Sequence, residues 1–536
     1  PIPIKSPYLK EIGNIVRKII DEKNEKLMEK VDELVYKAFG LDSGINQGNT
    51  EIIDNKEGAE CKLKKSDEKS LINMMYINIK YILKNDNFTL NECKDIFYNR
   101  LSIESYIQSS GININKYDVE IIKGIIKKYT YLSSKKILNH TTFKLSDLDL
   151  EMIKDVPQGG NWKNIPQEIV NKSQRLLKIS KSGGRTTLYG RIDYTKPCYT
   201  ITTYFNRPGN GTYVHPEQER VLSVREAARI QSFKDDYIFA GNKSQLLKQV
   251  GNAVPPILAY EIAKSIRKNV QCETSIDLFA GAGGMSIGFK EAGIKALVAN
   301  DFERSACTTF KINNPEVEVV HGDITTSEVK EKIYDAVNGI EVDLVCGGPP
   351  CQGFSLAGKR FIDDPRNQLF KEFIEVVEKI KPKVVVMENV EGMLSFMKGE
   401  IYNQIIELYN TLGYQVSGRV LLASEYGVPQ KRKRVIIICT RNDLNILPES
   451  LFPSKTTESP EKQVTAKDAI YDLSFSECFE DAVYHDIKTE QLSHYARKMR
   501  NYEGIDKKFT ETVLDVASIS EFNEELLDVP IQLKLF

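Results

Sequence analysis

The sequence predicts an α/β fold built on a parallel sheet with helices on both faces. Between residues 221 and 445, short apolar runs alternate with helical patterns, and the runs read TSIDLF, ALVAND, DLVCGG, VVVMENV and RVIIICT. Buried strands separated by helices are typical of parallel sheets. A glycine-rich turn also follows the first run, at the edge where open α/β sheets bind their ligands.

The rest of the chain differs in texture and predicts further domains. With 536 residues, of which 41% are hydrophobic, the chain is too long for one compact domain. Residues 1–137 are rich in Lys, Ile and Asn with helical periodicity, which predicts a helical accessory region. Residues 138–220 carry Gly, Pro and aromatic clusters that predict loops and short strands, and residues 446–536 form a mixed tail.

Composition limits the class of protein. The sequence has no run of 18 apolar residues and no signal-peptide pattern, so we expect a cytoplasmic protein with no membrane partner. Its nine cysteines are scattered without a CxxC pair, which predicts buried, reduced cysteines and no bound metal. The net charge of −1 neither supports nor excludes a nucleic-acid partner.

The strand, turn and helix at 275–291 form the candidate cofactor site. The glycine-rich turn lets the backbone approach a ligand closely, and the helix that follows offers unpaired N–H groups. No GK[ST] sequence follows the turn, which disfavours ATP. The candidate cofactor residues of this segment are Asp277, Phe279, Ala280, Gly281, Gly283 and Gly284.

Two further strand ends carry suitable side chains. The second strand ends at Asp301 and Phe302, where a carboxylate suits a pair of ribose hydroxyls and an aromatic ring can stack on adenine. The third strand is followed by Asp323 and Ile324, and Asp323 can accept a hydrogen bond from an adenine amino group. One such end is often an ordinary turn, but three in succession favour a nucleoside-type cofactor.

A cysteine follows the run DLVCGG. Pro349 and Pro350 fix the approach of the chain, so that Cys351 lies on a defined loop beyond the end of the strand. A lone cysteine in such a place is more often buried and inert, so a reactive role for Cys351 must be justified by the residues around it.

The neighbouring motifs resemble those of the cytosine-5 DNA methyltransferases. Pro-Pro-Cys-Gln-Gly-Phe-Ser at 349–355 is similar to their nucleophile motif, and FAGAGG at 279–284 to their S-adenosylmethionine motif. Glu-Asn-Val at 388–390 and Gln-Lys-Arg-Lys-Arg at 430–434 look like two further motifs of the family. Segments 225–233, 249–256 and 364–370 match as well, so the resemblance spans roughly residues 138–500.

The resemblance implies a Rossmann-like sheet of the S-adenosylmethionine-dependent methyltransferases with a smaller recognition domain. It implies S-adenosyl-L-methionine as the cofactor, and double-stranded DNA and a cognate restriction endonuclease as partners. To the cofactor residues it adds Asn252, Ala253 and Pro349. It assigns catalysis to Cys351, Glu388, Arg432 and Arg434, and DNA contacts to Gln352, Ser355, Thr202 and Arg366.

These residue types fit the chemistry of cytosine methylation. Because C5 of cytosine is a poor nucleophile, addition of the Cys351 thiolate to C6 converts the ring into an enamine that can attack a methyl donor. Glu388, when protonated or sharing a proton, can hydrogen-bond N3, and Arg434 can hold the O2 oxygen. Arg432 can steady the site or contact a backbone phosphate. In a duplex, the target base must first be flipped out of the stack.

The order of the motifs differs from the usual order of the family, in which Gly-Asn-Ala-Val-Pro-Pro comes last. Here that motif, at 251–256, precedes the cofactor turn, which predicts a circularly permuted chain. Residues 221–265 then hold the final motifs, and 272–445 form the cofactor-binding catalytic domain. Residues 138–220 and 446–536 are expected to share the recognition domain.

Two alternative functions compete with this interpretation. The first is a tRNA cytosine-5 methyltransferase of the same fold, which the sequence after Cys351 and the large recognition domain disfavour. The second is a catalytically silent DNA-binding partner subunit. The presence of Cys351, Glu388, Arg432 and Arg434 argues against such decay.

Overall fold

The fold is described from a computed structural model of the chain. The structure describes residues 65–85, 88–98, 101–183, 185–350, 368–394, 400–457, 459–476, 478, 482–484 and 491–500. The chain divides into two compact units. Unit 1 comprises residues 1–135 and 501–536, and unit 2 comprises residues 136–500.

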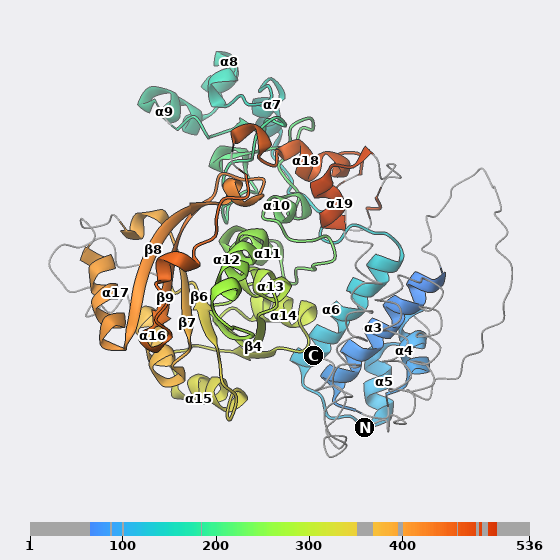
Figure 1. Cartoon of the computed structure of the whole chain (residues 1–536). Coiled ribbons are helices and arrows are strands. Elements are labelled where there is room, and N and C mark those ends of the chain that lie inside the picture. Colours follow the sequence, from blue (N-terminus) through green and yellow to red (C-terminus); the bar gives the residue numbers. More distant parts are fainter. Residues whose placement is uncertain are drawn as a thin grey trace, which may run out of the picture. The chain divides into compact units, whose positions relative to one another are not determined.

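The described part of unit 1 is helical, as the periodicity predicts. Its helices are α3 (Lys65–Leu83), α4 (Leu90–Phe97), α5 (Ile103–Ser110) and α6 (Lys116–Ser133). The helix α3 packs against α4 and α6, and α6 also packs against α5 (Figure 1). Their buried faces carry apolar residues at helical spacing, such as Ile121, Ile122 and Ile125 of α6.

Unit 2 is built on a seven-stranded sheet with the strand order β5-β4-β3-β6-β7-β9-β8. The strands are β3 (Thr274–Leu278), β4 (Lys295–Asp301), β5 (Glu318–His321), β6 (Leu344–Gly347), β7 (Val384–Asn389), β8 (Tyr414–Leu422) and β9 (Lys433–Arg441). The first five strands of this order run parallel. The chain leaves β3 toward β4 on one side, and β6 lies on the other side of β3. Ligands of open α/β sheets bind at such a reversal.

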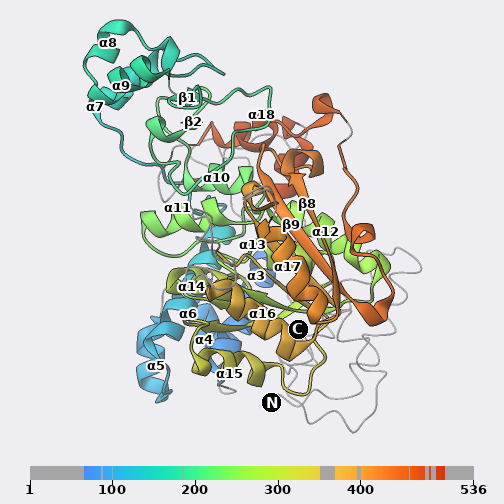
Figure 2. The same cartoon turned by 90° about the vertical axis from the view of Figure 1, so that its left-hand side faces the viewer.

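Helices cover both faces of the sheet, as predicted (Figure 2). On one face, α10 (Val224–Ile230), α12 (Pro256–Asn269) and α13 (Gly284–Glu291) share a core with Cys346, Val386 and Ile438. On the other face, α15 (Ser327–Ala336), α16 (Gln368–Ile380) and α17 (Glu400–Thr411) share a core with Val345, Val385 and Ile437. Alternate residues of one strand therefore enter opposite cores, which explains the uninterrupted apolar runs.

The direction of the last predicted strand is a correction. The run RVIIICT forms most of β9, but β9 pairs antiparallel with β7, and β8 pairs antiparallel with β9. The link between β8 and β9 holds only the short 3-10 helix Ala423–Tyr426 and a turn, and it contains no crossover helix. A short link joins antiparallel neighbours, whereas a parallel pair needs a crossover.

The segment 138–220 is also more helical than predicted. It contains α7 (Asp147–Lys154), α8 (Gln167–Asn171) and α9 (Gln174–Ser182) beside the short strands β1 (Gly190–Arg191) and β2 (Thr212–Val214). Ser146 and Ser173 cap α7 and α9 by accepting backbone hydrogen bonds. The apolar side chains of α7 to α9 pack on Trp162.

The remaining helices of unit 2 are α11 (Lys243–Asn252), α14 (Arg304–Asn313), α18 (Ala466–Ile470) and α19 (His494–Arg500). Within the described residues, no helix has both the length and the apolar character needed to cross a membrane. The six cysteines at 93, 198, 272, 307, 346 and 439 are buried and unpaired, as predicted for this residue type.

Candidate active site

A large cleft opens at the carboxyl ends of β3, β4, β5, β6 and β7. It brings together residues from predicted motifs that lie far apart in sequence, at 251–256, 279–284, 349–355, 388–390 and 430–434. The predicted cofactor residues that line it are Asp277, Phe279, Ala280, Gly281, Gly284, Asp301, Phe302, Asp323, Ile324, Pro349, Asn252 and Ala253. The structure thus places all but one of them, Gly283, on one surface.

The glycine-rich turn needs its glycines for two different reasons. Gly281 and Gly283 have φ angles of +56° and +83°, a region in which residues with a Cβ are strained. At Gly284, a Cβ atom would lie 2.3 Å from the carbonyl oxygen of Val254. Gly283 does not line the cleft but begins α13, so its contribution is to the shape of the turn.

Asp301 holds the glycine-rich turn in place. Its Oδ2 accepts a hydrogen bond from the backbone N–H of Gly281 at 2.8 Å, and its Oδ1 accepts one from Glu303 at 2.8 Å. Burial raises the pKa of this carboxyl group. Each carboxylate oxygen has a second lone pair that can accept from a ligand hydroxyl.

The predicted cofactor contacts at the next two positions, the Phe302 ring and the Asp323 carboxylate, differ in exposure. The ring of Phe302 is 67% exposed and lines the cleft beside Asp301. At the next strand end, Asp323 accepts a hydrogen bond from the backbone N–H of Thr325 at 3.0 Å, and Ile324 is buried beneath it. The cleft therefore offers an exposed aromatic face and two carboxylates.

Asp277 lies at the base of the same cleft, and its side chain is buried. The Ser286 hydroxyl donates to its Oδ2 at 2.5 Å, which ties β3 to α13. Burial raises the pKa of Asp277 to about 7. This residue thus stabilises the turn from within the fold.

Glu388 and Arg434 face each other at the other end of the cleft. Glu388 lies at the end of β7, and its Oε1 is 2.6 Å from Nε of Arg434 on β9. Both side chains are largely buried and line the cleft. Next to them, the Asn389 side chain donates to the carbonyl oxygen of Pro349 at 3.1 Å, which holds the chain that leads to Cys351.

Arg432 is buried, with 1% of its surface exposed. Its guanidinium donates to the carbonyl oxygens of Ile201 at 2.9 Å and Gly251 at 3.0 Å. Burial lowers its pKa to about 9. These contacts are those of a side chain that steadies the site, and in this structure the guanidinium does not reach the surface at which a backbone phosphate would lie. The functional role of Arg432 stays a prediction.

Gln430 has a role that the sequence analysis did not assign. Its side chain accepts from the backbone N–H of Ile201 at 3.0 Å and donates to the Gln231 side chain at 2.6 Å. It is fully buried, and its amide nitrogen also donates to the carbonyl oxygen of Ile230, the last residue of α10. The sequence feature that could have pointed to this role is the position of Gln430 two residues before Arg432 in the Gln-Lys-Arg-Lys-Arg motif.

The predicted DNA contacts are mostly untested by the structure. Cys351, Gln352, Ser355 and Arg366 lie outside the described residues. Thr202 is half-buried, and its hydroxyl lies 2.9 Å from the hydroxyl of Tyr213. Its contact to a phosphate stays a prediction.

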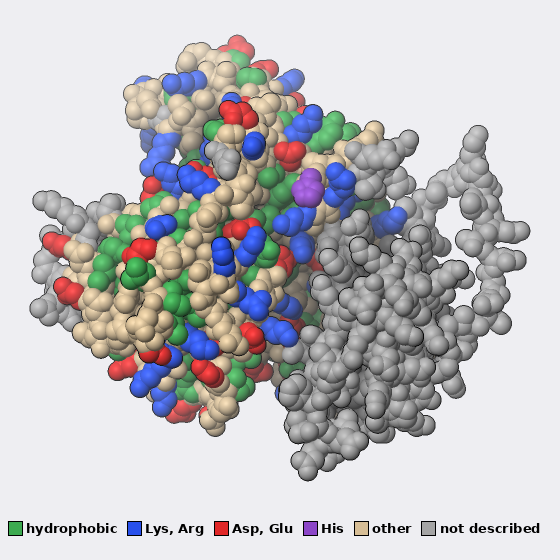
Figure 3. Space-filling model, viewed as in Figure 1, with side chains coloured by type: hydrophobic (Ala, Val, Ile, Leu, Met, Phe, Trp, Pro, Cys, Tyr) green, Lys and Arg blue, Asp and Glu red, His purple; other side chains and the backbone are tan. Residues whose placement is uncertain are grey.

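The cleft is also lined by basic and aromatic side chains that the sequence analysis missed. They are Tyr204, Arg207, Lys243 and Lys248. Tyr204 is 67% exposed. On the face seen in Figure 3, basic side chains also gather where the lobe of α7, α8 and α9 meets the rest of unit 2. Basic side chains are therefore concentrated locally, at the cleft, although the net charge of the whole chain is close to zero.

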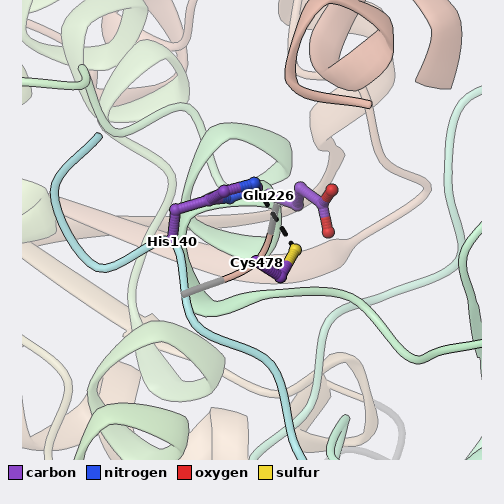
Figure 4. Close-up of side chains that lie close together, drawn as sticks. All are labelled: His140, Glu226 and Cys478. Atoms are coloured by element: carbon purple, nitrogen blue, oxygen red, sulfur yellow. Dashed lines mark hydrogen bonds between the residues drawn. The ribbon is translucent and has the colours of Figure 1, made fainter. Parts of the chain in front are cut away.

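His140, Glu226 and Cys478 form a cluster whose donor atoms lie within 4.8 Å of one another (Figure 4). Both oxygens of Glu226 already accept from the guanidinium of Arg220, at 2.6 and 2.7 Å. The His140 nitrogens lie 3.0 Å from the Ser223 hydroxyl and 3.4 Å from the Cys478 sulfur. Because a cation already occupies the carboxylate, the cluster is a hydrogen-bond network and a poor site for a metal ion.

Comparison with known proteins gives consistent results. The profile of the family described as C-5 cytosine-specific DNA methylase matches residues 64–268 and 274–525. The Type II methyltransferase M1.HphI of Haemophilus parahaemolyticus is 46% identical over 168 residues, which cover 31% of this chain and 45% of that protein. The Type II methyltransferase M.DdeI of Desulfomicrobium norvegicum is 37% identical over 266 residues, covering 47% and 62%. The chain thus spans about half the length of these relatives.

Among solved structures, the Dnmt2 methyltransferase of S. pombe is 26% identical, with a TM-score of 0.27. That match covers 32% of this chain and 51% of the other chain.

Fold and sequence together place the chain among the S-adenosylmethionine-dependent methyltransferases. More narrowly, it belongs to the C-5 cytosine-specific DNA methylase family, whose profile matches most of its length.

Proposed function

We propose that this protein transfers a methyl group from S-adenosyl-L-methionine to C5 of a cytosine in a specific double-stranded DNA site. The observation that carries the proposal is the position of the Glu388–Arg434 pair. It shares one cleft with the glycine-rich turn and with Pro350, the residue directly before Cys351. A nucleoside cofactor and a flipped base can therefore meet in this cleft.

The residues of the turn fit the cofactor. Nothing lies within 4 Å of a Cβ atom built at Gly281, so the backbone there is open to a ligand. Asp301 would accept from the ribose hydroxyls, the exposed ring of Phe302 would stack on adenine, and Asp323 would accept from the adenine amino group. When bound, S-adenosyl-L-methionine supplies an electrophilic methyl group.

The catalytic step follows from three side chains. The Cys351 thiolate adds to C6, and the ring carbon C5 gains the electron pair that attacks the methyl group. A proton shared between Glu388 and N3 makes the hydrogen bond to the ring, and Arg434 holds O2, so charge that develops on the ring is stabilised. Loss of the C5 proton to water then expels the Cys351 thiolate and restores the aromatic ring. Arg432 and Gln430 act as positioning residues, because their buried side chains hold the backbone around Ile201 and Gly251 in place.

We further propose that the chain is circularly permuted and that residues 138–220 and 446–536 together build the recognition domain. Only residues 270–273 separate α12 from β3, and α12 packs on α13 so closely that a Cβ on Gly288 would lie 2.3 Å from the Pro256 carbonyl oxygen. At the other junction, the Ile137 N–H donates to the Ala482 carbonyl at 2.8 Å. These contacts support a fusion of the usual ends and adjacency of the new ones.

As a family member with Type II relatives, the protein is proposed to act with a cognate restriction endonuclease in the cytoplasm of a bacterial or phage-infected cell. A tRNA substrate and a silent DNA-binding subunit remain the alternatives. The Glu388–Arg434 pair favours catalysis over the silent subunit, because a non-catalytic scaffold has no need for a charged pair in its cleft.

Bisulfite sequencing of DNA from cells that express the chain tests the proposal. We expect full protection of cytosine at one position of one short sequence. Incubation of the protein with S-adenosyl-L-methionine and duplex DNA that carries 5-fluorocytosine at that position should yield a covalent complex, because after methyl transfer the fluorine at C5 cannot leave as a proton and the thiolate is not expelled. Absence of methylated DNA together with methylated tRNA would establish the first alternative, and absence of both together with binding to duplex DNA would establish the second.

A further inference from the structure

The glycine-rich turn of the cleft is fixed by two side chains from different parts of the chain. One is the Asp301 carboxylate, which accepts from the Gly281 N–H at 2.8 Å. The other is Tyr237, whose hydroxyl donates to the carbonyl oxygen of Ala282 at 2.5 Å. Ala282 lines the cleft, whereas the buried Tyr237 does not. Tyr237 therefore acts on a bound ligand through the turn and not by direct contact.

Aromatic packing supports this hydrogen bond. The rings of Phe233 and Phe239 flank the Tyr237 ring, with their centroids 5.2 and 5.4 Å from its own. A Cβ atom on Gly283 would lie 3.2 Å from the Tyr237 hydroxyl, and one on Gly284 would lie 3.3 Å from the Phe233 ring. Burial raises the pKa of the Tyr237 hydroxyl, so the group stays protonated and remains a donor.

The 233–240 loop, which carries Tyr237 between α10 and α11, is itself held in place. The buried guanidinium of Arg225 on α10 donates to the Tyr237 carbonyl oxygen at 2.6 Å. The Asn313 side chain of α14 donates to the Ile238 carbonyl oxygen at 2.8 Å and accepts from the Ile238 N–H at 3.2 Å. Because these contacts fix the backbone at two successive residues, the phenol is held in one place relative to the turn.

The position of its acceptor distinguishes Tyr237 from another buried tyrosine of this unit. The Tyr414 hydroxyl of β8 donates to the carbonyl oxygen of Pro382 at 2.8 Å. Neither Tyr414 nor Pro382 lines the cleft, so their bond stabilises the fold alone. The acceptor of Tyr237, in contrast, belongs to the proposed cofactor surface. Ligand-binding groups that a supporting shell holds in position lose less free energy to ordering when the ligand binds.

We propose that Tyr237 is a positioning residue for the cofactor and holds the glycine-rich turn in its ligand-binding shape through the Ala282 carbonyl. The inference rests on the proposed function, because it takes the turn to be the binding site of S-adenosyl-L-methionine. It adds a residue that lies 45 positions before Ala282 in the sequence. Its removal should change the affinity for the cofactor and leave the chemical step intact.

Titration calorimetry of the full chain with S-adenosyl-L-methionine, without DNA, tests this inference. Tyr237→Phe keeps the ring and removes the hydroxyl, so the Kd should rise about three- to tenfold, the factor that one neutral hydrogen bond contributes. In steady-state methylation of duplex DNA, the KM for the cofactor should rise by a similar factor. The kcat at saturating cofactor should stay within about twofold of wild type, because the reacting groups are unchanged.

Two further variants separate positioning from stability. Tyr414→Phe is the matched control, since it removes a buried hydroxyl that donates to a backbone carbonyl away from the cleft. Both Tyr→Phe variants should lower the melting temperature by a similar amount, and only Tyr237→Phe should raise the Kd. Asn313→Ala releases the 233–240 loop but keeps the Tyr237 hydroxyl, so it should raise the Kd by a smaller factor.

A wild-type Kd in Tyr237→Phe, or an equal rise of the Kd in Tyr414→Phe, overturns the inference and leaves the proposed function standing. If Tyr237→Phe is too unstable to titrate, a wild-type Kd in Asn313→Ala overturns the inference in its place. Failure of the wild-type protein to bind S-adenosyl-L-methionine would refute the proposed function and the inference together.

Discussion

The Nε atom of Arg434 lies 2.6 Å from Oε1 of Glu388, and the two side chains come from neighbouring antiparallel strands. Because both are largely buried in the cleft, neither charge can be removed without leaving the other unpaired. The pair therefore behaves as one functional group, and its members should be tested together.

Glu388→Gln should lower the rate of methyl transfer by about 10²–10⁴-fold, the usual contribution of a positioned acid or base. Arg434→Lys should lower it as well, because lysine lacks the planar donor fork. The double variant should lose less than the product of the two effects. Single-turnover kinetics measure the rate in the two single variants and the double variant.

Lys433→Gln, which changes an exposed neighbour on β9, is the control, and its rate of methyl transfer should stay within about threefold of wild type. Multiplicative losses would show that the two residues act independently.

Asp301→Ala should weaken binding of S-adenosyl-L-methionine at least tenfold, since a charge-assisted hydrogen bond contributes about 1.5–3 kcal/mol. It should also lower the melting temperature, because the turn loses the acceptor for Gly281. Titration calorimetry measures the affinity, and Glu318→Ala, an exposed residue at the start of β5, is the control. Unchanged affinity in Asp301→Ala would reject its role as ribose ligand.

Arg432→Lys should destabilise unit 2 more than it slows the chemical step. Arg432 donates to the Ile201 and Gly251 carbonyls from two separate nitrogens, whereas a lysine carries all its donors on one, so we expect one carbonyl to lose its partner. An unpaired buried polar group costs about 1–3 kcal/mol. Denaturant unfolding measures the loss. At low temperature, where the variant is folded, the single-turnover rate should be within about tenfold of wild type. A large loss of rate in a stable variant would make Arg432 a catalytic residue.

Acid should destabilise the protein through His140 and His215. Burial lowers the pKa of each to about 4, below the ordinary value of 6.5. The unfolded chain therefore binds more protons between these values, so stability is fully present above pH 6.5 and falls as the pH drops toward 4. Among the neighbouring charges, Glu226 raises the pKa of both histidines and Arg220 lowers it. Arg229 also lowers the pKa of His140, and Arg191 that of His215.

Between pH 6.5 and 5, each histidine should cost about 2 kcal/mol. Urea unfolding at several pH values measures this slope. His215→Gln should be less stable at pH 7.5 and should show a shallower dependence on pH. An equally steep slope in both single variants, His215→Gln and His140→Gln, would assign the acid sensitivity to other groups.

Much of the fold and site could be predicted because the signals are local. The runs TSIDLF, ALVAND, DLVCGG and VVVMENV became β3, β4, β6 and β7, since burial on both faces leaves a continuous apolar run. The positions of Asp301 and Asp323 after successive strands placed them in one cleft, because carboxyl ends of parallel strands meet at one edge.

What the sequence determined by itself was the set of strands, the glycine-rich turn and the family to which the motifs belong. The tertiary structure decided the rest, because pairing partners lie far apart in the chain. It set the antiparallel direction of β9, buried Arg432 against Ile201 and Gly251, and joined His140 to Cys478 across 338 residues. Periodicity and turn chemistry report the neighbours of a residue along the chain, whereas burial and charge pairing depend on which segments fold against it.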